Sequence, residues 1–268
     1  MATDSGRFSC SDPNLQQVPS HHTAPGFRAC FRASPGHRLI VADYAQIELR
    51  VAAQVAPCPA MRAVFERGDD PHATTAATLT GKRAADISSR ERKLAKAINF
   101  GFLFGMGARR FRDYAAASYD LELDERQAQE ARDAFLRTYP GIANWHRRTG
   151  ALGRRGGHDP IFVATRLGRR RGFEPQAFSF TTALNIPVQG TAAEGFKAAM
   201  VLLDAQLPSL GGRGILCVHD EYLAEVPEAE AQRGKAMVEA AMIEGMRTVV
   251  PDVPVAVEAS ICEHWEEA

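Results

Sequence analysis

Apolar positions follow two different periods along the chain, and the change of period marks the predicted elements. Residues 38 to 43 (RLIVAD) form a short apolar run that predicts a buried strand. From Gln46 onward, apolar residues recur at steps of four, which predicts a helix, and residues 71 to 150 are predicted to be mostly helical with glycine breaks. Residues 215 to 226 (ILCVHDEYLAEV) predict two short strands with acidic residues at the tip between them.

The second half of the chain adds further elements. Residues 153 to 176, rich in arginine and glycine, predict loops with a short hairpin. The sequence T-A-A-E is typical of a capping box, so we expect a long helix to begin at Thr191. A helix near 228 to 248 and a strand at 253 to 261 (VPVAVEASI) are predicted to follow. Strands towards both ends and a helical middle predict an α+β fold, in which a sheet carries a helical insertion.

Charge is distributed unevenly over these elements. The formal net charge is zero, which by itself argues against a nucleic-acid partner. Residues 82 to 172, however, hold 20 Lys and Arg against 10 Asp and Glu, and the remaining residues hold 12 against 22. This split predicts a basic surface that faces a polyanion, with chance clustering on a solvated face as the alternative.

Composition narrows the class of protein further. The five cysteines are scattered, without a C-x-x-C pair or zinc-ligand spacing, which indicates reduced thiols in a cytosolic protein. Apolar runs stay well below the roughly 20 residues of a membrane helix. The first ten residues lack the basic and apolar regions of a signal peptide. We therefore expect a cytoplasmic protein with no membrane partner.

Two aspartates stand at predicted strand ends that are far apart in sequence. Asp43 ends the first strand and Asp220 lies at the tip of the hairpin. A single aspartate in a turn is more often structural, because its side chain bonds to the turn backbone. Two converging carboxylates would instead suit Mg²⁺, which takes one or two protein carboxylates together with substrate phosphate oxygens. The pair is thus a candidate for two-metal phosphoryl transfer.

A predicted helix from residue 88 combines cations with aromatic rings. Ser88 and Glu91 form an S-x-x-E capping box at its start. Four side chains then recur every four residues along one stripe: Arg92, Lys96, Phe100 and Phe104. The stripe matches a nucleoside triphosphate, which has phosphates at one end and a flat base at the other. The alternative is a buried aromatic pair beside two solvated cations.

Several longer segments carry a family resemblance. They are GRFSCSDPNLQQVP (6–19), VADYAQIELRVAA (41–53), RKLAKAINFGFLFGMG (92–107), NIPVQGTAAE (185–194) and VHDE (218–221). In this order the chain resembles the palm and fingers of a family A DNA polymerase, the bacterial DNA polymerase I type, over nearly its whole length. The second, third and fifth segments resemble the motifs A, B and C of that family.

The resemblance implies a role for each matching residue. The implied catalytic residues are Asp43, Asp220 and Glu221. The implied metal ligands are Asp43, Asp220 and the backbone carbonyl of Tyr44. The implied nucleotide-binding residues are Gln46, Glu48, His72, Arg92, Lys96, Phe100 and Phe104. Glu48 matches the steric gate that crowds the sugar 2′ position and excludes ribonucleotides. The implied DNA-binding residues are Arg7, Asn185, Gln189 and His219.

The resemblance also implies an activity and an architecture. The activity is template-directed addition of deoxynucleotides to a primer 3′-end, with two Mg²⁺ ions (or Mn²⁺) as cofactors and with primer–template DNA and deoxynucleoside triphosphates as partners. We expect residues 1–55 and 181–268 to form the palm and residues 56–180 the fingers. The family's thumb and exonuclease regions do not fit within the chain, so we expect a fragment, a compact relative, or a chain whose partner is a separate polypeptide that carries the thumb or the exonuclease.

Two positions depart from the family pattern. Phe104 stands where the family usually has a tyrosine, so the gate at Glu48 is expected to lack a phenol partner. Thr181 stands where the family often has an arginine, so weaker DNA binding is expected.

Two other functions fit part of the same pattern. A truncated or degenerate remnant would bind DNA weakly without polymerising, and a chain without a thumb favours that alternative. A two-metal nuclease would use the same acids, but it has no need of a cation and aromatic stripe.

Overall fold

A computed structural model of the chain describes residues 3–21, 23–154 and 159–268. The chain divides into two compact units. Unit 1 comprises Met1–Ile47, Gln189–Pro251 and Val255–Ala268, and unit 2 comprises Glu48–Val188 and Asp252–Pro254. The chain therefore passes between the units near residues 47 and 188, about eight residues from the palm and fingers boundaries expected from the sequence.

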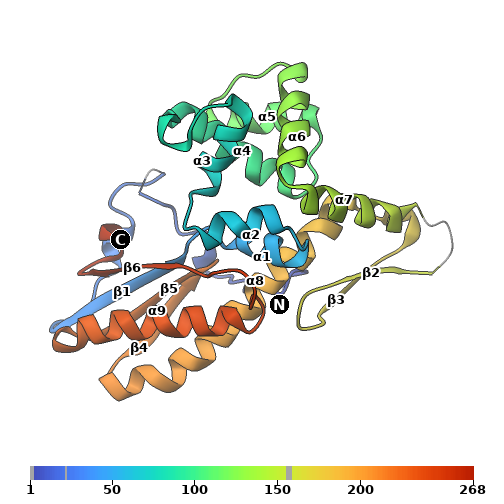
Figure 1. Cartoon of the computed structure of the whole chain (residues 1–268). Coiled ribbons are helices and arrows are strands. Elements are labelled where there is room, and N and C mark those ends of the chain that lie inside the picture. Colours follow the sequence, from blue (N-terminus) through green and yellow to red (C-terminus); the bar gives the residue numbers. More distant parts are fainter. Residues whose placement is uncertain (1–2, 22, 155–158) are drawn as a thin grey trace. The chain divides into compact units, whose positions relative to one another are not determined.

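Unit 1 is built on a four-stranded antiparallel sheet (Figure 1). Its strands are β1 (His37–Tyr44), β4 (Arg213–Val218), β5 (Glu221–Pro227) and β6 (Val257–Cys262), in the order β4-β5-β1-β6. The strand predicted at 38 to 43 and the acidic hairpin are confirmed. The last strand begins four residues later than predicted, at Val257.

Both faces of this sheet are covered, which explains the continuous apolar run in β1. Helix α9 (Ala231–Arg247) packs against β1, β5 and β6 on one face (Figure 1). On the other face, Leu39 and Val41 pack with Trp265, and with Phe31 from the N-terminal loops. Because successive side chains of a strand point to opposite faces, a strand buried on both sides needs apolar residues at every position.

Unit 2 is mostly helical. It contains α1 (Ile47–Val55) from its second residue, α2 (Pro59–Glu66), α3 (Pro71–Thr80), α4 (Ser89–Leu103), α5 (Ala108–Tyr119), α6 (Glu125–Thr138) and α7 (Pro140–Gly153). Its aromatic core brings Phe102 within 4.2 Å of Phe111 and 6.2 Å of Phe135 between ring centroids. The predicted short hairpin is present as β2 (Ile161–Ala164) and β3 (Arg170–Phe173), while residues 155–158 of the predicted loop lie outside the described residues.

The long helix α8 (Phe180–Gln206) corrects one sequence prediction. It begins at Phe180, eleven residues before the predicted start, and continues through Pro187 and Thr191. Ser179 caps this end, because its hydroxyl accepts a hydrogen bond from the backbone N–H of Thr182 at 3.4 Å. The capping-box prediction at Thr191 is wrong because the residues before it are already helical, and its side chain is fully buried.

The stripe on α4 is also shorter than predicted. The capping box is confirmed, since Ser88 and Glu91 exchange both of its hydrogen bonds. The helix ends at Leu103, so Phe104 is its C-cap residue and lies outside the regular turns.

The predicted α+β class, a sheet with a mostly helical insertion, is confirmed. None of the helices that the structure describes is long and apolar enough to cross a membrane.

Candidate active site

The three predicted catalytic acids meet at one end of the sheet in unit 1. In the antiparallel register, Asp43 of β1 lies directly opposite Glu221 of β5, and opposite Glu258 of β6 on its other side. Asp220 occupies the turn that joins β4 to β5, immediately before Glu221. Two segments 177 residues apart in sequence are therefore joined by strand pairing, which makes the predicted convergence of Asp43 and Asp220 a property of the fold.

A two-residue turn places Asp220 at this end of the sheet. His219 adopts a positive φ of 58°, a conformation in which glycine is usual. Its backbone N–H donates to the side-chain oxygen of Gln16 at 3.0 Å, and the Gln16 amide donates to the carbonyl of Cys217 at 2.6 Å. Gln16 thus forms hydrogen bonds with the backbone on both sides of the turn, and these hold His219 in the left-handed conformation without a glycine.

The acids raise one another's pKa. Burial and the charges of Asp220, Glu221 and Glu258 raise the pKa of Asp43 to about 7. Burial raises the pKa of Asp220, although the charges of Arg7 and His219 oppose this shift. Burial also raises the pKa of Glu221. Burial therefore disfavours the ionised form of all three acids, and at Asp43 the neighbouring acids add to this effect, so a cation would be favoured here.

Predicted DNA contacts lie beside Asp220. Arg7, Tyr44 and His219 line one narrow hollow with Asp220 in unit 1. The Tyr44 hydroxyl donates to the carbonyl of Met242 at 2.7 Å, which fixes the ring and orients the backbone of the last β1 residue. Burial raises the pKa of Tyr44, so this hydroxyl keeps its proton. The neighbouring Gln46 has a positive φ of 49° in the turn before α1.

Glu221 is held by two residues that the sequence analysis did not select. The indole N–H of Trp265 donates to its Oε1 at 2.7 Å, and Arg28 lies 3.5 Å from its Oε2. The Arg28 guanidinium also stacks 4.0 Å from the centre of the Trp265 ring. Both carboxylate oxygens therefore have protein partners, which makes Glu221 less available to a metal ion than Asp43 or Asp220.

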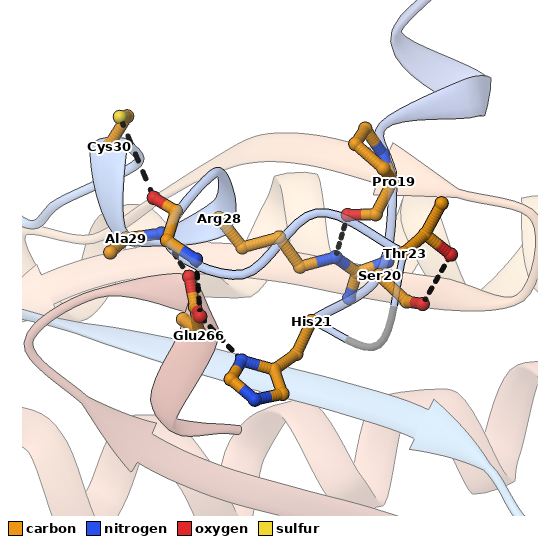
Figure 2. Close-up of polar contacts among 9 residues, drawn as sticks. Pro19, Ser20, His21, Thr23, Arg28, Ala29, Cys30 and Glu266 are labelled. Carbon is orange, nitrogen blue, oxygen red and sulfur yellow. Dashed lines mark hydrogen bonds and ion pairs between the residues drawn. The ribbon is translucent and has the colours of Figure 1, made fainter.

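A network of loop contacts positions Arg28 (Figure 2). Its Nε donates to the carbonyl of Pro19 at 3.2 Å. The Glu266 carboxylate accepts hydrogen bonds from the backbone N–H groups of Gly26 and Ala29, and it contacts the His21 ring at 2.6 Å. These contacts tie His21, Gly26 and Ala29 to Glu266 near the C-terminal end of the chain, and so hold Arg28 beside Glu221.

Unit 2 carries the predicted triphosphate contacts. The Asp70 carboxylate caps α3 by accepting a hydrogen bond from the backbone N–H of His72 at 2.9 Å. It also accepts a hydrogen bond from the Nε–H of Arg92 at 2.5 Å. Burial would raise the pKa of Asp70, but these hydrogen bonds outweigh it and lower the pKa. Arg92 is thereby oriented by an ionised carboxylate while half of its side chain stays exposed.

His72 is almost fully buried and neutral. Burial and the charges of Arg92 and Lys96 lower its pKa to about 4. The side-chain amide of Asn99 donates to Nδ1 of His72 at 2.9 Å, so in the neutral ring the proton lies on Nε2. The ring lies 5.8 Å from that of Phe100, so four of the predicted contacts, His72, Arg92, Lys96 and Phe100, gather around one end of α3 and one face of α4.

The remaining candidates are placed as follows. Glu48 is half-buried in the first turn of α1, and Phe104 is half-buried at the end of α4. Asn185 and Gln189 are half-buried in α8, the first in unit 2 and the second in unit 1.

Sequence reasoning missed the residues that orient the others. Asp70, Asn99, Arg28 and Trp265 each contact a predicted site residue. Of these four residues, only Asp70 could have been found from the sequence, because an aspartate directly before a proline is typical of a helix start.

The donor set in unit 1 fits Mg²⁺ in the presence of a nucleotide. Among the described residues, no three His, Cys, Asp or Glu side chains gather closely enough to hold a metal ion by themselves. Mg²⁺ normally keeps waters or substrate phosphate oxygens and takes only one or two carboxylates. Asp43 and Asp220, close enough to raise each other's energy when ionised, satisfy that need.

Comparison with known proteins places this arrangement in a family. The model of DNA polymerase family A matches residues 1–267. DNA polymerase I of Aquifex aeolicus (strain VF5) is 36% identical over 262 residues, which cover 97% of this chain and 44% of the relative. The thermostable DNA polymerase I of Thermus filiformis is 39% identical over 278 aligned residues, which cover 100% of this chain and 32% of the relative.

A solved structure agrees with these relatives. The chain is similar to the POL domain of Pol1 from M. smegmatis in complex with DNA primer-template and dNTP, with a TM-score of 0.85 and 28% identity. The match covers 99% of this chain and 47% of that one. The chain therefore belongs to DNA polymerase family A. It spans less than half of the length of these relatives.

Proposed function

We propose that this chain is the polymerising part of a template-directed DNA polymerase, which adds deoxynucleotides to a primer 3′-end by two-metal-ion phosphoryl transfer. The observation that carries the proposal is the meeting of Asp43, Asp220 and Glu221 at one end of the sheet, where burial raises the pKa of all three and neighbouring acids raise those of Asp43 and Glu221 further. Membership of family A and the complex of the related POL domain with primer-template and dNTP support it.

In this proposal, Asp43, Asp220 and the backbone carbonyl of Tyr44 hold two Mg²⁺ ions, for which Mn²⁺ can substitute. The chemistry that these ions supply when bound is activation of the primer 3′-hydroxyl and stabilisation of charge on the departing pyrophosphate. Glu221, held by Trp265 and Arg28, keeps the acidic cluster in place. Arg7, Gln189 and His219 act as DNA contacts of unit 1, and Asn185 acts as a DNA contact of unit 2.

The triphosphate is assigned to unit 2. Arg92 and Lys96 neutralise phosphate charge, and the Nε2–H of His72 supplies a neutral donor beside them. Phe100 packs under the incoming sugar and base, next to Phe104. Glu48, with Gln46 before it, acts as the gate that excludes a 2′-hydroxyl. The cation and aromatic grouping favours a polymerase over a nuclease, because a nuclease has no triphosphate to bind.

A primer-extension assay tests the proposal. With Mg²⁺ and all four deoxynucleotides, the parent chain should extend a primer, and Asp43→Ala or Asp220→Ala should abolish extension while the circular-dichroism spectrum is unchanged. Glu239→Gln, a surface acid on α9, is the matched control and should extend normally. Normal extension by either aspartate variant would refute the assignment.

The same assay separates the remaining alternatives. The parent is assayed alone and with an added thumb-bearing segment, since a separate polypeptide of that kind is the partner that we expect. If neither condition yields extension, the degenerate-remnant alternative is favoured. If the labelled DNA is shortened instead, the nuclease is favoured.

A further inference from the structure

Besides the hollow in unit 1, the structure has a hollow in unit 2 that has no role in the proposed polymerase chemistry. It lies between α6, α7 and the segment that leads into α8, and its volume is about 560 Å³. Small-molecule sites in proteins usually have volumes of about 300 to 1,000 Å³. The hollow is therefore large enough for a molecule the size of a nucleotide.

Its polar lining is strongly basic. Arg132, Arg147 and Arg154 all line it, and the residues described around it include no aspartate or glutamate. Arg147 donates to the side chain of the neutral Asn144, and Arg132 approaches the nearby Asp133 only to 3.9 Å. Three guanidinium groups in one concave site attract an anion, and their planar geometry suits the oxygens of a phosphate.

Its apolar lining is aromatic. Phe178 and Phe180 are both half-buried and line the hollow with His146. The rings of His146 and Phe180 meet edge to face at 5.9 Å. The Nε2–H of His146 donates to the carbonyl of Leu103 at 2.8 Å, and burial lowers its pKa, so this ring is neutral and fixed. A flat, apolar ligand group can pack against these rings.

Two glycines on α7 keep the hollow open. A Cβ atom at Gly153 would lie 2.4 Å from the ring of Phe178, so only glycine allows that ring to pack there. At Gly150 the nearest atoms to a Cβ would be Nη1 of Arg154 at 3.2 Å and Cε2 of Phe180 at 3.6 Å, both of which line the hollow. A long side chain at position 150 would therefore fill the space that the arginines surround.

We propose that this hollow binds a nucleoside phosphate, with its phosphate on Arg132, Arg147 and Arg154 and its base against Phe178 and Phe180. A free nucleotide and a nucleotide within single-stranded DNA present this same chemistry. The site needs no metal, because its lining contains no carboxylate to hold one. It is independent of the triphosphate contacts on α3 and α4.

Calorimetric titration of the whole chain with dAMP in EDTA tests the proposal. We expect saturable binding of one dAMP, with inorganic phosphate and deoxyadenosine each binding at least tenfold more weakly. Arg147→Gln should weaken dAMP binding at least fivefold, and Gly150→Leu should abolish it. The matched controls are Arg148→Gln, an exposed arginine outside the lining, and Gly150→Ala, and both should bind within twofold of the parent.

A short oligo(dA) titrated in parallel distinguishes the two sources of the nucleotide. If the parent binds the oligonucleotide more tightly than dAMP and Gly150→Leu removes that difference, the ligand is a strand of DNA. If the parent binds dAMP more tightly, the ligand is a free nucleotide. Lys96→Ala should leave dAMP affinity unchanged in EDTA. The proposal is overturned if neither probe binds saturably, if inorganic phosphate binds as tightly as dAMP, or if Lys96→Ala but not Arg147→Gln removes binding.

Discussion

Asp43 is the residue whose surroundings say most about the chemistry of this site. It is the penultimate residue of the apolar strand β1, yet it faces three other acids across or beside that strand. Burial and these acids together make an ionised carboxylate unfavourable here without a cation, and they raise the pKa of Asp43 to about 7. Charge at this residue therefore links proton binding, metal binding and stability.

A pH-dependent stability is expected from Asp43 in metal-free buffer. The folded protein keeps the proton up to about pH 7, whereas the unfolded chain releases it near pH 3.8. Stability that depends on this group is thus lost as the pH rises from about 4 to 7. Asp43→Asn should flatten that loss, and its melting temperature at pH 8 should exceed that of the parent.

Mg²⁺ provides the control for this measurement. Added at pH 8, it should raise the melting temperature of the parent more than that of Asp43→Asn. Calorimetry from pH 4 to 8 measures the melting temperatures of the parent and of Asp43→Asn. If the melting temperatures of both proteins fall equally with pH, the charge coupling at Asp43 is contradicted.

Lys96 supports a second expectation at this scale. Lys96→Ala should raise the KM for deoxynucleotides about 10- to 100-fold, since a charge-assisted hydrogen bond contributes about 1.5 to 3 kcal/mol. The Kd for primer–template should change less than twofold. Lys93→Ala, also exposed on α4, is the matched control and should resemble the parent. An equal loss of nucleotide and DNA binding would argue against a triphosphate contact.

At the scale of elements, unit 1 depends on a close approach of two helices. Gly245 of α9 lies against Ala199 of α8, and a Cβ at position 245 would be 2.2 Å from the backbone nitrogen of Ala199. Helix backbones in such contact have no flexible side chain that can move aside. Because α9 also covers one face of the sheet, a shift of this helix would disturb the strands that position the acids.

Substitution of glycine on α9 tests this contact. Gly245→Ala should lower the free energy of unfolding by about 1 to 2 kcal/mol, because an overpacking cost of up to about 3 kcal/mol exceeds the gain of about 1 kcal/mol in helix propensity. Gly234→Ala on the same helix should be nearly neutral, since its Cβ would meet only methyl groups of Val226 at 3.1 Å or more. Urea unfolding of both variants measures the difference. Similar free energies of unfolding for the two variants would show that α8 and α9 can separate to admit the extra methyl group.

At the scale of the whole molecule, the uneven charge predicts how the chain meets DNA. The basic excess in residues 82–172 offers cations to phosphates, while the formal net charge is zero. Affinity for DNA should therefore depend on salt through a limited number of phosphate contacts. We propose that Thr181 leaves one such contact unmade, because the resemblance matches it to a position where the family often has an arginine.

Replacing this residue tests the count of phosphate contacts. For Thr181→Arg, a plot of log K against log salt should steepen by about 0.9, the value of one added phosphate contact on duplex DNA. Thr181→Gln is the neutral control and should keep the slope of the parent. Fluorescence anisotropy with labelled primer–template at several salt concentrations gives both slopes. An unchanged slope for the arginine variant would exclude a phosphate contact at this position.

Particular residues show how far the sequence alone could reach. The strand before Asp43, the hairpin around Asp220 and the capping box of α4 are local patterns, and the structure confirms all three. The helix start at Thr191 was wrong because a capping pattern is read locally, whereas α8 is held by side chains buried on both sides of Thr191, from Ala183 to Leu203. The partners of Glu221 and His72 carry no local signal, since each is distant in sequence from the residue that it contacts.

By itself, the sequence determined which residues carry charge, where the chain alternates between strand and helix, and the family to which those motifs belong. The first two properties follow from side-chain chemistry and from periods of two and 3.6 residues, which act over short distances along the chain, whereas the family followed from the resemblance of the motifs. The tertiary structure alone decided that Asp43 faces Glu221 across paired strands, that Trp265 and Arg28 occupy both oxygens of Glu221, and that three arginines surround one hollow. Such contacts depend on how distant segments pack, and packing has no period that a single sequence displays.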